Sequence, residues 1–116
     1  MPLSSQQDER GFIRIVLQGS WPTLGEAIEL RQTLGDITDV RRILIDIRDA
    51  TGPLPKYPDI RETVGAVGKT PENERRRAFV VSSDVQFGVA RTFQAIVPGS
   101  MEVFRDESAA VEWLLR

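Results

Sequence analysis

The fold is decided by one apolar run near the middle of the chain, Arg42-Ile43-Leu44-Ile45-Asp46-Ile47. Its β-branched residues favour a strand, and the absence of apolar–polar alternation indicates that both faces of this strand are covered. Strands of this kind are typical of parallel sheets with helices packed on them. The run therefore predicts a central parallel strand. Asp46 inside it predicts a buried carboxylate, which needs hydrogen-bond donors or a charged partner.

Further strands are indicated on both sides of this run. Residues 12–17 are rich in β-branched side chains and bounded by glycines, residues 78–81 are a short apolar run, and residues 101–104 are expected to form the last strand. Turn-forming residues at positions 8–11 precede the first of these strands. They predict that residues 3–7 form a short antiparallel partner at the edge of the sheet.

Segments with helical periodicity lie between the strands. Thr23 and Glu26 form a capping box that opens a helix over residues 24–34, and Ser83 and Gln86 form another that opens a helix over residues 83–97. Asp59 is placed to cap a helix that runs to about residue 69, and Asp106 is placed to cap a terminal helix. The side chains expected to face the core are Ile60, Val64 and Val67 in the second helix, Val85, Val89, Phe93 and Ile96 in the third, and Ala110, Trp113 and Leu114 in the last. Residues 72–77 are interpreted as a charged, solvated connector.

This alternation of strands and helices predicts an α/β fold with a mixed, mostly parallel sheet of four or five strands and four helices. The 116 residues match the length of a single domain, and no linker or repeat divides them. We therefore expect one domain over residues 1–116.

Composition excludes several classes of function. Fifteen basic and seventeen acidic side chains give a net charge of −2, which does not indicate a nucleic-acid partner. The sequence has no cysteine and no histidine, which removes disulfides, thiolate metal sites and the commonest general base. Residues 1–5 lack the features of a signal peptide, and no apolar stretch is long enough to span a membrane. We expect a cytoplasmic protein with no metal and no cofactor.

Several stretches carry a family resemblance. The segment Ile43-Leu44-Ile45-Asp46-Ile47-Arg48-Asp49-Ala50-Thr51-Gly52 is similar to the central strand and following loop of STAS domains, and Gln18-Gly19-Ser20 is similar to the glycine that ends their second strand. More specific are residues 78–91, residues 103–107 and Trp113-Leu114, which resemble the SpoIIAA-like branch of small, single-domain bacterial STAS proteins. The resemblance covers roughly residues 3–114 and implies a SpoIIAA-like fold.

The resemblance also implies a regulatory, protein-binding domain. The better-understood STAS relatives are anti-sigma-factor antagonists, which are switched by phosphorylation of a serine in the loop after the central strand. In this chain Leu54-Pro55-Lys56 stands near the place of the expected Asp-Ser pair, and the nearby hydroxyls are those of Thr51 and Tyr57. The implied partner is another protein of an anti-sigma or signalling type. The fold is also similar to that of CRAL-TRIO-type lipid-transfer domains, which makes a small apolar ligand the alternative.

Candidate site residues gather where the parallel strands are predicted to end, because ligands of open α/β sheets bind at that edge. The segments expected to meet there are residues 49–52, 82–84 and 105–106. Ser82 and Ser83 either hold an anion at the start of the following helix, or Ser83 simply caps that helix and Ser82 ends a strand, and the second interpretation is favoured. Asp46 either binds a metal together with Asp49 and Asp84, or forms a structural ion pair or a bond to loop backbone, and the structural roles are favoured.

Phe87 and Arg91 are predicted to lie on the outward side of their helix. An exposed aromatic residue and an arginine are side chains that anchor protein interfaces. The alternative is that Phe87 packs under a neighbouring loop and that Arg91 pairs with Asp84 or Glu102. The sequence favours neither.

The function expected from these features is that of a non-catalytic interaction module, either monomeric or homodimeric. It would act through residues 51–57 and the helix face that begins at Phe87. Its candidate partner-binding residues are Asp49, Thr51, Tyr57, Ser82, Ser83, Asp84, Phe87 and Arg91. The alternative is a carrier of a small apolar ligand, with a pocket between the sheet and residues 59–69. An enzyme is not expected, because the sequence has neither a GxSxG elbow nor a glycine-rich phosphate loop.

Overall fold

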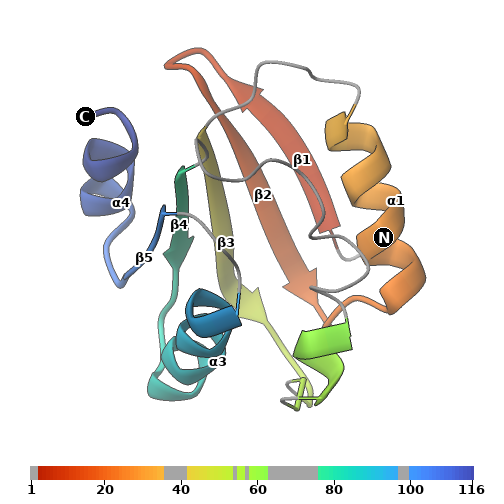
Figure 1. Ribbon diagram of the computed structural model, residues 1–116. Helices are drawn as coiled ribbons and strands as arrows, with labels where there is room; N and C mark the ends of the chain where they lie inside the picture. Colours follow the sequence, from red (N-terminus) through yellow and green to blue (C-terminus); the bar gives the residue numbers. More distant parts are fainter. Residues whose placement is uncertain (1–2, 36–41, 54, 57, 63–75, 97–99) are drawn as a thin grey trace.

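The computed structural model describes residues 3–35, 42–53, 55–56, 58–62, 76–96 and 100–116. Within them, five strands form one sheet in the order β1-β2-β3-β4-β5, which is also their order in the sequence. The strands are β1 (Leu3–Asp8), β2 (Phe12–Gly19), β3 (Arg42–Ala50), β4 (Arg76–Val80) and β5 (Ser100–Phe104). The arrowheads of β2, β3 and β4 point to the same end of the sheet, and that of β1 points the opposite way (Figure 1). The predicted mixed, mostly parallel sheet is confirmed.

The only antiparallel pair among the described strands is β1–β2, whose register runs from Leu3 opposite Leu17 to Asp8 opposite Phe12. A tight turn joins these two strands: the N–H of Gly11 donates to the carbonyl of Asp8 at 3.0 Å, and Gly11 has a φ of 98°. Glycine adopts this left-handed conformation without the steric penalty of a Cβ atom. The predicted edge hairpin is therefore present.

The helices α1, α3 and α4 begin where their capping residues predict. The helices with complete bounds are α1 (Leu24–Gly35), α3 (Asp84–Ile96) and α4 (Glu107–Leu114). In the box before α1, the N–H of Glu26 donates to Thr23 Oγ1 at 3.2 Å, and Glu26 Oε1 accepts from the N–H of Thr23 at 3.0 Å. Asp106 caps α4 by accepting from the N–H of Ser108 at 3.2 Å. Residues 58–62 are helical, so the prediction that Asp59 caps this helix is wrong: Asp59 lies inside the first turn, and its Oδ2 accepts from the N–H of Lys56 at 3.3 Å. Tyr57 and the rest of the predicted second helix, including Val64 and Val67, lie outside the described residues.

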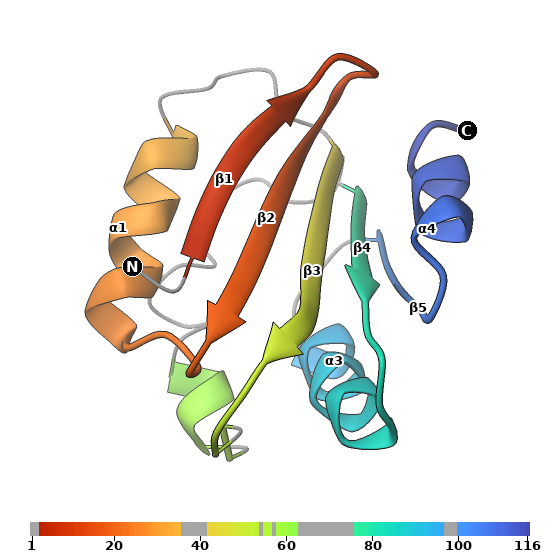
Figure 2. The same cartoon turned by 180° about the vertical axis from the view of Figure 1, so that it is seen from behind.

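The two faces of the sheet carry separate cores, because alternate residues of a strand point to opposite faces. On one face Phe79 and Val81 pack with Leu17, Ile47 and Ala90 of α3. On the other face Ala78 and Val80 pack with Phe12, Leu44 and Leu114 of α4. Figures 1 and 2, which view the sheet from opposite sides, show α3 at the end toward which β2, β3 and β4 point and α4 beside β4 and β5. Thus α3 and α4 cover opposite faces of the sheet.

Part of the predicted connector is wrong. Arg76 and Arg77 begin β4 instead of ending a solvated loop. Arg76 Nη1 donates to the carbonyls of Trp113 and Arg116, at 3.2 and 3.1 Å, and its guanidinium lies 5.6 Å from the centre of the Trp113 ring. A cation that binds the last carbonyls of a helix is favourable because that end carries partial negative charge. Arg76 therefore fixes the end of α4 to the sheet.

No helix in the described part of the chain is long and apolar enough to cross a membrane.

Candidate functional site

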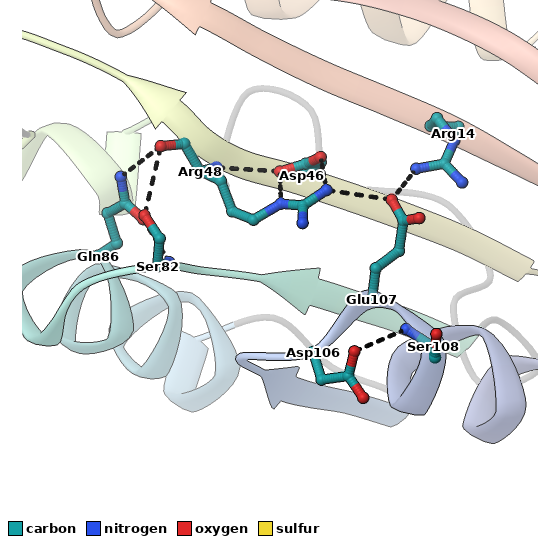
Figure 3. A network of polar contacts seen from close by, with 8 residues as sticks. All are labelled: Arg14, Asp46, Arg48, Ser82, Gln86, Asp106, Glu107 and Ser108. Atoms are coloured by element: carbon teal, nitrogen blue, oxygen red, sulfur yellow. Dashed lines mark hydrogen bonds and ion pairs between the residues drawn. The ribbon is translucent and has the colours of Figure 1, made fainter.

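The segments predicted to meet at the carboxyl ends of the strands do so in part: residues 82–84 contact Arg105 and the carbonyl of Arg48, whereas Thr51 bonds to the end of β2. The N–H of Thr51 donates to the carbonyl of Gly19 at 2.7 Å, which joins the end of β3 to the end of β2. Gln86 Nε2 donates to the carbonyl of Arg48 at 3.2 Å, and Ser82 Oγ lies 3.4 Å from the same carbonyl (Figure 3). Arg105 Nη2 donates to Asp84 Oδ1 at 2.5 Å. We call this edge of the sheet the rim.

Ser83 of the rim caps α3. The N–H of Gln86 donates to Ser83 Oγ at 3.1 Å, as expected for a capping residue. Gln86 Oε1 accepts from the N–H of Ser82 at 2.8 Å and from its hydroxyl at 3.1 Å. The capping box is therefore displaced by one residue, because Gln86 reaches Ser82 in place of Ser83. These bonds confirm the capping interpretation.

Asp46 forms the structural ion pair that the sequence favoured. Its carboxylate accepts three hydrogen bonds from Arg48, from the backbone N–H and Nε at 3.0 Å and from Nη2 at 2.8 Å. Burial raises the pKa of Asp46, but the hydrogen bonds and positive charge of Arg48 outweigh it, so that the pKa lies below its usual value. The same pairing raises the pKa of Arg48. Asp46 therefore stays ionised near neutral pH.

This pair extends to β2 and to α4, which the sequence did not predict. Glu107 Oε1 accepts from Arg48 Nη2 at 3.1 Å and from Arg14 Nη1, so that one carboxylate joins two strands to the last helix (Figure 3). The sequence signal that could have identified Arg14 is that it is a charged residue among the apolar residues of β2. We call Arg14, Asp46, Arg48 and Glu107 the charged network.

The three carboxylates considered for a metal site, those of Asp46, Asp49 and Asp84, have different surroundings. Asp46 is enclosed by Arg48, whereas Asp49 is exposed at the end of β3 and Asp84 pairs with Arg105. No group of three or more His, Cys, Asp or Glu side chains suited to a metal ion is found within the described ranges. Thr51 is exposed beside Asp49, and Tyr57 lies outside the described residues.

The orientation of α3 differs from the prediction. Val85 was expected to face the sheet, but it is 65% exposed. The buried residues of α3 are Gln86, Val89 and Ala90. Val89 thus faces the core as expected. Phe93 also packs against the core, with its ring centre 5.7 Å from that of Phe79. The prediction failed at Val85 because the buried amide of Gln86, which bonds to the rim, takes the inward position in the first turn.

Phe87 is half-buried and packs against the core on the side of α3. The guanidinium of Arg105 lies 5.2 Å from the centre of its ring. These contacts correspond to the alternative in which Phe87 packs under a neighbouring loop. Arg91 is exposed, and the partner of Asp84 is Arg105. The outward side of α3 is therefore made by Asp84, Val85, Gly88, Arg91 and Ala95, all exposed, which we call the α3 face.

A shallow hollow of about 470 Å³ lies at the opposite end of β2, beside the hairpin. It is lined by Gln6, Gln7, Asp8, Glu9, Arg10 and Arg14. Arg10 already binds both oxygens of Asp8, at 2.9 and 3.0 Å, and holds the pKa of Asp8 at about 2. Arg14 binds Glu107. The charges of Asp8, Arg10 and Arg14 are thus paired within the chain, and we do not take this hollow as the site.

Comparison with known proteins supplies the fold. No family model matches the chain, and no curated protein matches it. Among solved structures, the chain is similar to an uncharacterized protein of the DUF3478 family from Shewanella loihica PV-4, which is described as having a SpoIIAA-like fold. The two share 21% sequence identity with a TM-score of 0.64, and the match covers 97% of this chain and 91% of the other. This protein therefore has a SpoIIAA-like fold, as the resemblance in its sequence implied.

Proposed function

We propose that this chain is a non-catalytic regulatory module that binds another protein through the α3 face and the adjoining rim. The observation that carries the proposal is Gly88, in the middle of α3. Gly88 does not have a positive φ, so its backbone conformation does not require glycine. A Cβ atom added to it would meet nothing within 4 Å. Glycine costs a helix about 1 kcal/mol relative to alanine, so the fold itself gains nothing from it. A glycine at an exposed position allows another backbone to approach closely.

The exposure of Val85 also supports the proposal that the α3 face binds a protein. It and Leu115 are the large apolar side chains that are exposed in the described part of the chain. Val85 lies in the first turn of α3, next to the ion pair of Asp84 with Arg105. An apolar side chain beside charged residues is the usual composition of a protein interface. Asp49 and Thr51 extend this exposed surface along the rim.

The hydrogen bonds of the rim support a non-catalytic role. A serine nucleophile needs a neighbouring base that accepts its proton. The Ser82 hydroxyl donates to the amide oxygen of Gln86 and lies 3.4 Å from the carbonyl of Arg48. Neither oxygen is basic enough to act as a general base at neutral pH. Asp46, which is basic in principle, is held by three hydrogen bonds from Arg48.

Replacing Gly88 by alanine is expected to raise the free energy of unfolding by about 1 kcal/mol, because alanine is the better helix former and its Cβ has free space. Gly52 provides the contrast. Its Cβ would also meet nothing within 4 Å, but its φ is 78°, so Gly52→Ala should lower stability by about 1 kcal/mol. Urea unfolding of the two variants checks both signs. A loss of stability in Gly88→Ala would mean that the fold itself requires this glycine.

The function is tested by photo-crosslinking in cells. A photo-reactive phenylalanine analogue at Ala95, on the α3 face, is expected to give a discrete adduct with a protein other than this chain. The same analogue at Glu112, exposed on α4, serves as the control and should give none. Gly88→Gln introduces a better helix former but places a long side chain on the α3 face, and it should abolish the adduct. Equal adducts from both positions, or an adduct that persists in a folded Gly88→Gln variant, would contradict the proposal.

A further inference from the structure

We propose that a second copy of this chain also occupies the α3 face, with the two α3 helices antiparallel and a two-fold axis near Gly88. This inference rests on the proposed function, because it takes the α3 face to be a binding surface and names a second copy of the chain as one molecule that binds there. It would make self-association and partner binding mutually exclusive, so that the concentration of the protein controls how much of the face is free.

The spacing of the exposed residues permits close packing of two helices. Asp84, Gly88, Arg91 and Ala95 follow at intervals of four, three and four residues, which places them on one stripe about 60° wide. At 1.5 Å per residue, Asp84 and Arg91 lie about 10 Å apart along the axis. Gly88 lies between them, and Ala95 ends the stripe with another small side chain. Two such stripes can therefore meet with their backbones close together.

The charges of the stripe make it complementary to itself. The acid stands near the start of α3 and the base two turns later. In an antiparallel pair, Asp84 of each copy lies opposite Arg91 of the other, so that the two-fold axis produces two ion pairs from one sequence pattern. A parallel pair would place like charges opposite each other. The pattern therefore selects the antiparallel arrangement.

Asp84 is free to make this contact. Its side chain is 91% exposed, and Arg105 binds it through Oδ1. A carboxylate accepts hydrogen bonds on both oxygens, which leaves Oδ2 for an incoming guanidinium. Arg91 is also exposed. Val85, on the flank of the stripe, would lose contact with water when the second helix docks, which adds an apolar contribution to the two ion pairs.

Charge reversal tests the arrangement. In analytical ultracentrifugation, the wild-type protein should form a dimer whose fraction rises with protein concentration. We expect a dissociation constant of about 1 mM or lower. Asp84→Arg and Arg91→Asp each place like charges across the axis, and each is expected to weaken the dimer at least tenfold. An equimolar mixture of these two variants should form a heterodimer, because each then offers the charge that the other lacks. The double variant Asp84→Arg/Arg91→Asp should dimerise like the wild type.

The mixture separates this proposal from simple damage to the fold, since unfolded variants would not pair. A wild-type protein that stays monomeric throughout would overturn the inference, and so would single variants that still dimerise. Two monomeric variants that fail to pair when mixed would also overturn the antiparallel arrangement. In each of these cases an adduct of another protein at Ala95 would leave the proposed function standing. The loss of that adduct with a dimer present would contradict the proposed function alone.

Discussion

Replacing Leu114 by alanine is expected to lower the free energy of unfolding by about 3 kcal/mol, because the change leaves a cavity in a core that is otherwise closely packed. Leu114 is 0% exposed and packs with Phe12, Leu44 and Val80, so it holds α4 on the sheet. For a domain of this length, that loss corresponds to a melting temperature about 10 °C lower. Urea unfolding and thermal melts measure both quantities.

The neighbouring leucine provides a matched control. Leu115 is 37% exposed and follows directly after α4. Leu115→Ala removes the same atoms from a position that water already reaches, and its effect should stay within about 0.5 kcal/mol. Equal losses in the two variants would show that α4 is not docked through the face that contains Leu114.

Replacing Asp46 by alanine is expected to cost about 2 to 3 kcal/mol. The change removes the acceptor of three hydrogen bonds from Arg48 and leaves a charged guanidinium beside an apolar core. The cost lies below that of breaking a fully buried pair, because the Arg48 side chain is 38% exposed and keeps its contact with Glu107. Asp49→Ala, on the same strand but exposed, should change stability by no more than about 0.5 kcal/mol.

The pH dependence of this effect follows from the lowered pKa of Asp46. A carboxyl group whose pKa is lower in the folded chain stabilises the fold above the pKa of the unfolded chain, about 3.9 for aspartate. That stabilisation is lost as the pH falls through the lower, folded value. The difference in unfolding free energy between wild type and Asp46→Asn should therefore be constant near neutral pH and shrink below about pH 4. A difference that grows on acidification would mean that Asp46 is not the acceptor of an ion pair.

Most of the fold was predictable because its signals are local. The apolar run around Leu44 indicated the central strand, and the residue pairs Thr23/Glu26 and Ser83/Gln86 marked where helices begin. The orientation of α3 was not predictable by the same means. Counting apolar residues placed Val85 inward, whereas the structure turns Gln86 inward because its amide satisfies Ser82 and the carbonyl of Arg48. A polar side chain that bonds to two neighbouring segments leaves no periodic pattern in the sequence.

The site was predictable only in part, for a similar reason. Sequence reasoning identified Asp46 as a structural acid and Ser83 as a cap, since both depend on residues close by in the chain. Arg14 and Glu107 are 93 positions apart, and their contact depends on which strands are neighbours and on where α4 docks. The α3 face became visible once burial showed which side of the helix is exposed.

The placement of α4 has a consequence for how the protein is made. Because each strand pairs with the one before it, the sheet can grow strand by strand as synthesis proceeds. The helix that covers Phe12, Leu44 and Val80 is the last described element to leave the ribosome. Until α4 docks, this face of the nascent sheet exposes an apolar surface that chaperones and other nascent chains can bind. A ribosome that stalls shortly before α4 would therefore hold a sheet with this apolar face uncovered, which favours aggregation.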